Sequence, residues 1–356
     1  MRTLLIVLCS LFSTTLMADG FVTAHDGRLF FPESPDRPAY FVGVTMAKAP
    51  LTLSRGNKPS LKQLKADFDR LQDLGVNVVS VSLCGQGHGD SLACFDEKIL
   101  EGLDTILAEA ERRHIYIMVC LTAGECPYCH ISHYAETLLL PQRFNTFTHK
   151  TYEDSPALMA WQLSGNLDDV QSLADRLKSA DSHHLIAASA GTEGFGRDSR
   201  TVCSTLLANP SVDILSLELL PTDIGWASVS ALHTAMPHIY LKTEEAFTAI
   251  NRLNAPLVKP VILGRVGYER DKGHCHSAAT TRSRDALFTF VISHLAESRT
   301  NAGALCGACF YGWDCAPSPD NSPSGELPPH APGQYTIFRS DETSLNIIAS
   351  FPKSAP

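Results

Sequence analysis

Cysteine and histidine side chains gather in two short segments whose residue types suit metal, haem or thiol chemistry. The first segment, Cys126-Pro127-Tyr128-Cys129-His130, matches the Cys-x-x-Cys-His pattern of covalent c-type haem attachment. A Cys-x-x-Cys pair also serves as a dithiol redox centre or as two thiolate ligands of zinc. The second segment, His274-Cys275-His276, adds three potential ligands. Zinc or c-type haem held by these residues is therefore one alternative, although their spacing identifies no second haem ligand.

The start of the chain makes disulfide bonds the favoured use of the cysteines. Residues 1–18 contain Arg2, then the apolar run Leu4-Leu5-Ile6-Val7-Leu8, and end at Ala18, which is the pattern of a secretory signal peptide. Its removal takes Cys9 away and leaves ten of the eleven cysteines, an even number in an oxidising compartment. We therefore expect a secreted or periplasmic protein with disulfides in its loops and no cofactor.

The composition describes an ordinary globular chain and excludes some partners. The 356 residues are 44% hydrophobic and 19% charged, which suits one (β/α)8 barrel or two smaller domains. A formal net charge of −9 argues against a nucleic-acid partner, which favours a basic surface. Beyond residue 18 no apolar run is long enough to span a bilayer, so no transmembrane segment is expected.

Strand patterns and helix patterns alternate along the chain. Residues 41–44 form the first expected core strand, after a hairpin with its turn at Asp26-Gly27. Apolar residues at helical spacing predict a helix from Ser60 to Leu74, and the pattern recurs over residues 95–113. We expect further apolar strands at residues 76–81, 115–120, 158–163, 185–188, 214–217, 260–263 and 304–310. About eight strands with helical crossovers predict a single α/β domain over residues 19–356, a (β/α)8 TIM barrel with long loops at its C-terminal face.

Most of the cysteines fall in loops at one end of this expected barrel, where the strands finish. Disulfides there would fasten long loops that the barrel itself does not hold. The cysteines concerned follow the second, third and seventh strands or surround the eighth: Cys84, Cys94, Cys126, Cys129, Cys275, Cys306, Cys309 and Cys315. The sequence does not give their connectivity.

The run Trp161-Gln162-Leu163-Ser164-Gly165-Asn166 resembles a known family signature. In glycoside hydrolase family 5, most closely in its β-mannanases, the fourth strand reads Trp-Glu-Leu-x-Asn-Glu-Pro, and the second Glu is the general acid/base. The resemblance extends over nearly the whole mature chain, from Gly20 to about Phe351. Other matching segments are Tyr40-Phe41-Val42-Gly43, Leu74-Gly75-Val76-Asn77, Phe310-Tyr311-Gly312-Trp313 and Pro332-Gly333-Gln334-Tyr335. The resemblance implies a barrel whose cleft takes β-mannan or a related polysaccharide.

Both catalytic carboxylates of that family are replaced in this chain. The resemblance places the acid/base at Asn166, preceded by Gly165, and the nucleophile at Arg265. Retaining hydrolysis needs two carboxyl groups roughly 5 Å apart. An amide cannot donate and retrieve a proton, and a guanidinium stays protonated and is not nucleophilic. Supporting positions differ too, with Ser80 for an Arg, Glu218-Leu219-Leu220-Pro221 for His-x-Tyr-Pro, and Tyr311 for a stacking Trp.

Glu218 leaves open an active glycosidase with relocated acids. It stands at the expected end of the sixth strand, where the family has no acid, and Asp168 or Asp169, just past the fourth strand, would be its partner. We favour instead an ion pair between Glu218 and Arg265 in the space of the lost carboxylates. An adjacent cation keeps a carboxylate ionised and therefore unable to act as an acid.

The sequence therefore predicts a secreted pseudoenzyme with the fold of a glycoside hydrolase. Its expected role is non-catalytic, either binding a β-mannan-type polysaccharide or oligosaccharide or acting as a scaffold for another protein. The active glycosidase and a metal-, haem- or thiol-dependent protein remain the alternatives. The expected ligand-binding residues combine the altered family positions with aromatic platforms for sugar rings: Gly165, Asn166, Glu218, Arg265, Trp226, Tyr311 and Trp313, with Tyr128 as a further aromatic candidate.

Overall fold

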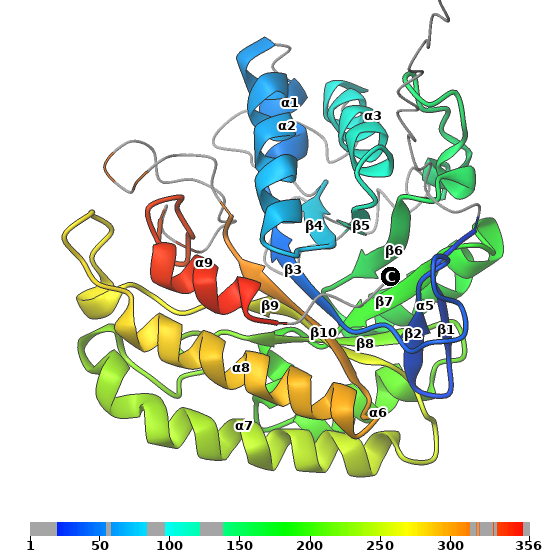
Figure 1. The fold of residues 1–356 in the computed structure, drawn as a ribbon. Coiled ribbons are helices and arrows are strands. Elements are labelled where there is room, and N and C mark those ends of the chain that lie inside the picture. Colours follow the sequence, from blue (N-terminus) through cyan, green and yellow to red (C-terminus); the bar gives the residue numbers. More distant parts are fainter. Residues whose placement is uncertain are drawn as a thin grey trace, which may run out of the picture.

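The centre of the molecule is a closed barrel of eight parallel strands in the order β10-β3-β4-β5-β6-β7-β8-β9 (Figure 1). The computed structural model describes residues 20–54, 58–83, 97–121, 138–313, 318, 320, 330 and 333–351. Nearly all strand side chains are buried, because helices cover the outside of the barrel and side chains fill its inside. The expected (β/α)8 barrel is confirmed. Its strands are β3 (Phe41–Thr45), β4 (Val78–Ser82), β5 (Tyr116–Cys120), β6 (Leu158–Leu163), β7 (Leu185–Ser189), β8 (Ile214–Leu219), β9 (Val261–Val266) and β10 (Leu305–Tyr311).

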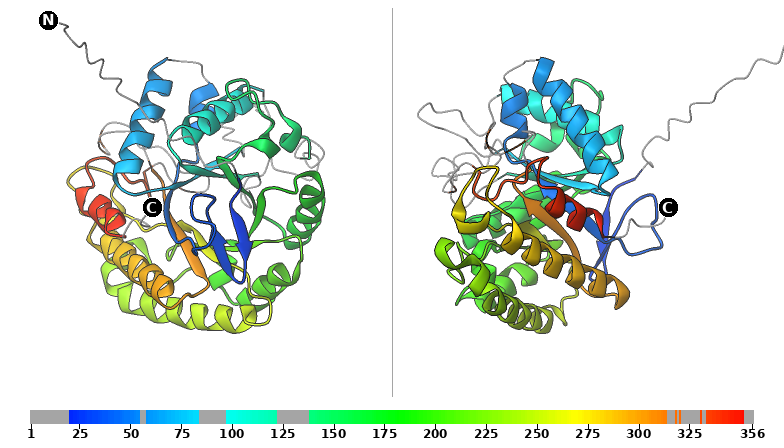
Figure 2. Two further views of the ribbon diagram at one scale, coloured as in Figure 1. Left: turned by 45° about the vertical axis from the view of Figure 1, so that its right-hand side comes forward. Right: turned by 60° about the vertical axis from the view of Figure 1, so that its left-hand side comes forward.

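Helices form a ring around the barrel (Figure 2). Each of the longer helices turns an apolar stripe inward; in α3, for example, Leu103, Ile106 and Leu107 are completely buried. The helices are α1 (Ala49–Ser54), α2 (Lys58–Asp73), α3 (Glu97–Glu111), α5 (Leu167–Ala180), α6 (Ser199–Ala208), α7 (Leu232–Asn254), α8 (Arg282–Thr300) and α9 (Glu342–Ala349). Within the described ranges, none of them combines the length and apolarity needed to cross a membrane.

A two-stranded hairpin, β1 (Thr23–His25) and β2 (Arg28–Phe30), precedes the barrel. Its turn residues Asp26 and Gly27 both have positive φ, 51° and 71°, as the tight turns that match strand twist require. The Arg28 side chain donates to the carbonyl oxygen of Ala302, which lies just before β10. The hairpin therefore lies against the end of the barrel where the strands begin (Figure 2), and the predicted turn is confirmed. The opposite end, where the strands finish, is left for a site.

Asp181, which ends α5, connects β6 to the start of β7 through buried hydrogen bonds. Its Oδ2 accepts from Trp161 Nε1 at 2.7 Å and lies 2.8 Å from His184 Nδ1, and both Asp181 and His184 are completely buried. Burial alone would raise the pKa of Asp181, but the hydrogen bonds from His184 and Trp161 outweigh it and lower that pKa to about 2. The carboxylate thus fixes the two strands that carry part of the site.

We expect this lowered pKa to make the fold acid-sensitive. A carboxyl whose pKa is lower in the folded state than in the unfolded chain stabilises the fold above its unfolded pKa, near 4, and loses that contribution as the pH falls towards 2. A shift of nearly two units corresponds to about 2.5 kcal/mol. Urea unfolding of Asp181→Asn should show a weaker loss of stability between pH 5 and pH 2 than the wild type. Equal acid dependence in the two proteins would contradict this role.

Candidate functional site

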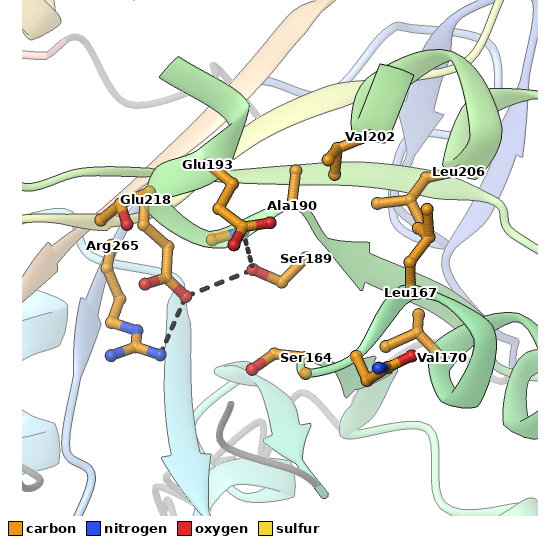
Figure 3. A pocket seen from close by; sticks show the side chains of 14 residues that line it. Ser164, Leu167, Val170, Ser189, Ala190, Glu193, Val202, Leu206, Glu218 and Arg265 are labelled. Carbon is orange, nitrogen blue, oxygen red and sulfur yellow. Dashed lines mark hydrogen bonds and ion pairs between the residues drawn. The ribbon is translucent and has the colours of Figure 1, made fainter. Parts of the chain in front are cut away.

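A pocket of about 390 Å³ opens at the C-terminal ends of β6, β7, β8 and β9 (Figure 3). Residues 164–167 and 189–193 line it, and Val170 on α5 and Val202 and Leu206 on α6 add side chains. Glu218 at the end of β8 and Arg265 in β9 complete the lining. Gly165, Asn166, Glu218 and Arg265, which were predicted from sequence, are therefore brought together in one pocket.

Arg265 and Glu218 form an ion pair at the mouth of the barrel (Figure 3). The two residues are direct neighbours in the parallel register of β8 and β9. Arg265 Nη2 lies 2.8 Å from Glu218 Oε1, and the two side chains are only 12% and 7% exposed. Ser189 donates its hydroxyl to the same Glu218 oxygen at 3.2 Å, and the guanidinium carbon lies 5.4 Å from the centre of the Tyr311 ring. The predicted pair, with Arg265 turned inward, is confirmed.

Asn166 begins α5 as its N-cap residue. Its Oδ1 accepts a hydrogen bond from the backbone N–H of Asp168 at 2.9 Å, and Gly165 before it has φ of 135°, a value that glycine adopts readily. Asp168 and Asp169 lie in the first turn of α5, where a negative charge favours the helix dipole. Among the described residues that line the pocket, neither aspartate is present. Their predicted partnership with Glu218 thus finds no support in the geometry.

Glu193 is a pocket carboxylate that sequence reasoning missed. It lies in a short 3-10 helix, Gly191–Phe195, which follows β7, and its side chain is exposed at the pocket. The sequence signal was its place in a loop just after an expected strand, but no motif marks it. Glu218 and Glu193 are the two carboxylates among the described residues that line the pocket. Glu218 already forms an ion pair with Arg265.

The prediction that aromatic side chains offer platforms for sugar rings is partly wrong. Tyr311 is 0% exposed and Trp313 is 2% exposed, so neither offers a free face to a ligand in this structure. Arg265, His330 and Tyr335 all pack around the Tyr311 ring. Trp226 is half-buried and packs edge-on against Phe195, with ring centres 5.7 Å apart. Tyr128 lies outside the described residues.

A second group of titratable side chains lies beside the ion pair. Tyr335 donates its hydroxyl to Asp223 at 3.0 Å, and His330 Nδ1 lies 3.6 Å from the other oxygen of that carboxylate. Burial raises the pKa of Asp223; the Tyr335 hydrogen bond opposes this rise and the Glu218 charge adds to it. Burial and the charge of Arg265 lower the pKa of His330 to about 4. The His330 ring is therefore neutral near pH 7, and its contact with Asp223 is not an ion pair there.

The structure corrects the disulfide prediction for two cysteines. Cys306 and Cys309 are free thiols buried within β10, the strand that was expected at residues 304–310, and they do not fasten a loop. Burial raises the pKa of the Cys306 thiol to about 12, which makes it unreactive. Five of the other loop cysteines, Cys84, Cys94, Cys126, Cys129 and Cys315, lie outside the described residues, so disulfides among them stay a prediction.

The structure describes only some of the residues that were predicted to bind metal or haem. His274 and His276 follow β9, are exposed and stack on each other with ring centres 5.3 Å apart. In the described ranges no group of three or more His, Cys, Asp or Glu side chains is placed to hold a metal ion. Cys126, Cys129 and His130, like the predicted signal peptide at residues 1–18, lie outside those ranges.

The sequence of this chain matches a known family model and several curated proteins. A model of the GH family 5 beta-mannosidase-like family matches residues 125–355. Mannan endo-1,4-beta-mannosidase 3 of Arabidopsis thaliana is 25% identical over 275 residues, which cover 61% of this chain and 63% of that protein. Mannan endo-1,4-beta-mannosidase 7 of the same plant is 27% identical over 270 residues, covering 61% and 60%. The chain thus matches somewhat less than two thirds of the length of these curated relatives.

Solved structures share the fold at lower identity. The glycoside hydrolase family 5 mannosidase from Rhizomucor miehei superposes with a TM-score of 0.77 at 15% identity, covering 94% of this chain and 97% of that one. The endo-1,4-beta-mannanase of Rhizomucor miehei superposes with a TM-score of 0.63 at 17% identity, covering 93% and 98%. At these identities the likeness concerns the fold.

Proposed function

The chain belongs to the GH family 5 beta-mannosidase-like family, and we propose that it binds glycan in the family's cleft without the family's hydrolytic chemistry. The observation that carries this proposal is the Arg265–Glu218 ion pair, 2.8 Å long and largely buried, at the end of β9 where the resemblance expects the nucleophile. An arginine there supplies a fixed positive charge and hydrogen-bond donors but no electron pair for attack on a sugar carbon.

The acid/base position supports the same proposal. Asn166 caps α5 with its side-chain oxygen, which is a structural use of an amide. A retaining glycosidase needs a carboxyl there that gives and takes back a proton. Glu218 is not free to replace it, because its carboxylate pairs with Arg265 at 2.8 Å and accepts a hydrogen bond from Ser189.

We propose a β-mannan-type oligosaccharide or polysaccharide as the ligand. Two named relatives are mannan endo-1,4-beta-mannosidases, and one structural neighbour was solved with mannosyl-fructose. The polar part of the pocket, with Ser164, Ser189 and Asn166, offers hydroxyl and amide groups suited to sugar hydroxyls. We also propose that the protein is exported to the periplasm or the cell exterior after signal-peptide cleavage. Such polysaccharides are encountered in those compartments.

The purified protein is expected to release no reducing ends from β-1,4-mannan or cellulose above background. Loss of general acid–base catalysis alone lowers the hydrolysis rate by about 10²–10⁴-fold, and loss of the covalent route lowers it further. The measurement is a long-duration reducing-sugar assay, run beside isothermal titration with mannotetraose. Binding without turnover supports the proposal.

Two variants separate the other outcomes of that assay. Turnover that disappears in Glu218→Gln would establish a rebuilt mechanism with relocated acids. Turnover that survives Glu218→Gln would show that the carboxylates lie elsewhere in the chain. The matched control is Glu245→Gln on α7, an exposed glutamate paired with Lys242 and remote from the pocket.

A further inference from the structure

The pocket has two chemically different ends (Figure 3). Arg265, Glu218 and Ser189 lie together at one end and are connected by the ion pair and a hydrogen bond. The other end lies between α5 and α6. It is formed by aliphatic side chains, namely Leu167, Val170, Val202 and Leu206.

The aliphatic end comes from matching faces of the two helices. Leu167 and Val170 are three residues apart on α5, and Val202 and Leu206 are four apart on α6, so each pair lies on one helix face. Val170 and Leu206 are 3% and 1% exposed and form the floor. Leu167 and Val202 are half-buried and flank the opening. This apolar surface is continuous with the polar end and gains free energy when a ligand covers it.

The lining residues also limit the shape of what fits there. Among the described residues that line the pocket, no aromatic side chain is present, so a flat ring has no stacking partner at this end. Branched aliphatic walls instead suit a short, flexible acyl or alkyl group. The volume of about 390 Å³ is at the lower end of the range of ligand sites, which suits one sugar ring with a small substituent.

We propose that this pocket binds a sugar residue that carries a short aliphatic acyl or alkyl substituent. The sugar hydroxyls face the Arg265–Glu218 end, and the substituent inserts between Leu167 and Val202. This inference rests on the proposed glycan-binding function and adds the class of ligand that distinguishes this cleft.

Two ligands that differ only in their apolar group provide the test. Isothermal titration would compare methyl β-mannoside with hexyl β-mannoside, the latter below its micelle concentration. Each buried methylene contributes about fourfold in affinity, so burial of only two of the added methylenes gives a gain of tenfold or more. In Val202→Asp this gain should vanish, and in the isosteric Val202→Thr it should shrink. The control Leu241→Asp, at a 57% exposed leucine on α7, should keep it.

The outcomes distinguish this inference from the function on which it rests. Equal affinity for the two mannosides, unaffected by Val202→Asp, would overturn the aliphatic subsite while leaving glycan binding intact. Absence of binding by both mannosides and by mannotetraose would overturn the glycan-binding proposal, and this inference with it. Retention of the hexyl advantage in a folded Val202→Asp variant would show that the alkyl group binds elsewhere.

Discussion

Replacing Asp341 with alanine is expected to destabilise the fold by about 3–5 kcal/mol, because it leaves two buried arginines without their shared counter-ion. Arg270 Nη1 lies 2.7 and 2.8 Å from the two carboxylate oxygens of Asp341, and Arg284 Nη2 lies 2.5 Å from one of them. The three side chains are 5%, 0% and 1% exposed in the order Arg270, Arg284, Asp341. Urea unfolding at pH 7 measures the effect.

This triad joins three parts of the chain behind the site. Arg270 follows β9, Arg284 lies in α8, and Asp341 precedes α9. A matched control is Asp69→Ala, since Asp69 is 63% exposed and pairs with Arg113 at the surface. An exposed ion pair of that kind contributes about 0–1 kcal/mol to the free energy of unfolding. Equal losses of stability in Asp341→Ala and Asp69→Ala would contradict the role of the triad.

Replacing Arg265 with methionine is expected to destabilise the fold by about 3 kcal/mol at pH 7. The change leaves the Glu218 carboxylate, which is 7% exposed, without its cation in a low-dielectric site. Met fills much of the same volume, so packing over Tyr311 is largely kept. The double variant Arg265→Met with Glu218→Gln removes the unpaired charge and should recover most of the loss.

A double-mutant cycle with urea unfolding at pH 7 checks this expectation. Additive losses in the double variant would show that the two residues do not interact, and would remove the observation on which the proposed function rests.

The barrel could be predicted from sequence because its signal is local and repeated. Parallel strands buried on both sides are continuous apolar runs, and the run at residues 158–163 coincides with β6. Gly165, Asn166, Glu218 and Arg265 line one pocket for a related reason, since strand ends meet at one end of a parallel barrel. Two neighbouring strands then bring Glu218 and Arg265 together by register alone.

Other parts of the site depend on contacts that sequence spacing does not encode. Tyr311 is at the expected end of β10, yet its ring is covered by Arg265 and is not available for stacking. Asp223 and His330 are more than a hundred residues apart and meet only through the folded loops. Cys306 and Cys309 lie within the strand that was expected at residues 304–310, but grouping them with the loop cysteines did not take into account that this strand buries their side chains.

Intact-protein mass spectrometry after incubation with 2-deoxy-2-fluoro-β-mannosyl fluoride tests the proposed loss of the family's chemistry most directly. A retaining glycosidase attacks such a reagent with its nucleophilic carboxylate and accumulates a covalent glycosyl-enzyme. The proposal places Arg265 at the nucleophile position, and Glu218 is held in an ion pair, so the protein should keep its unmodified mass while an active β-mannanase treated in parallel gains one sugar. A stoichiometric adduct that maps to Glu218, Glu193 or any other carboxylate of this chain would contradict the account.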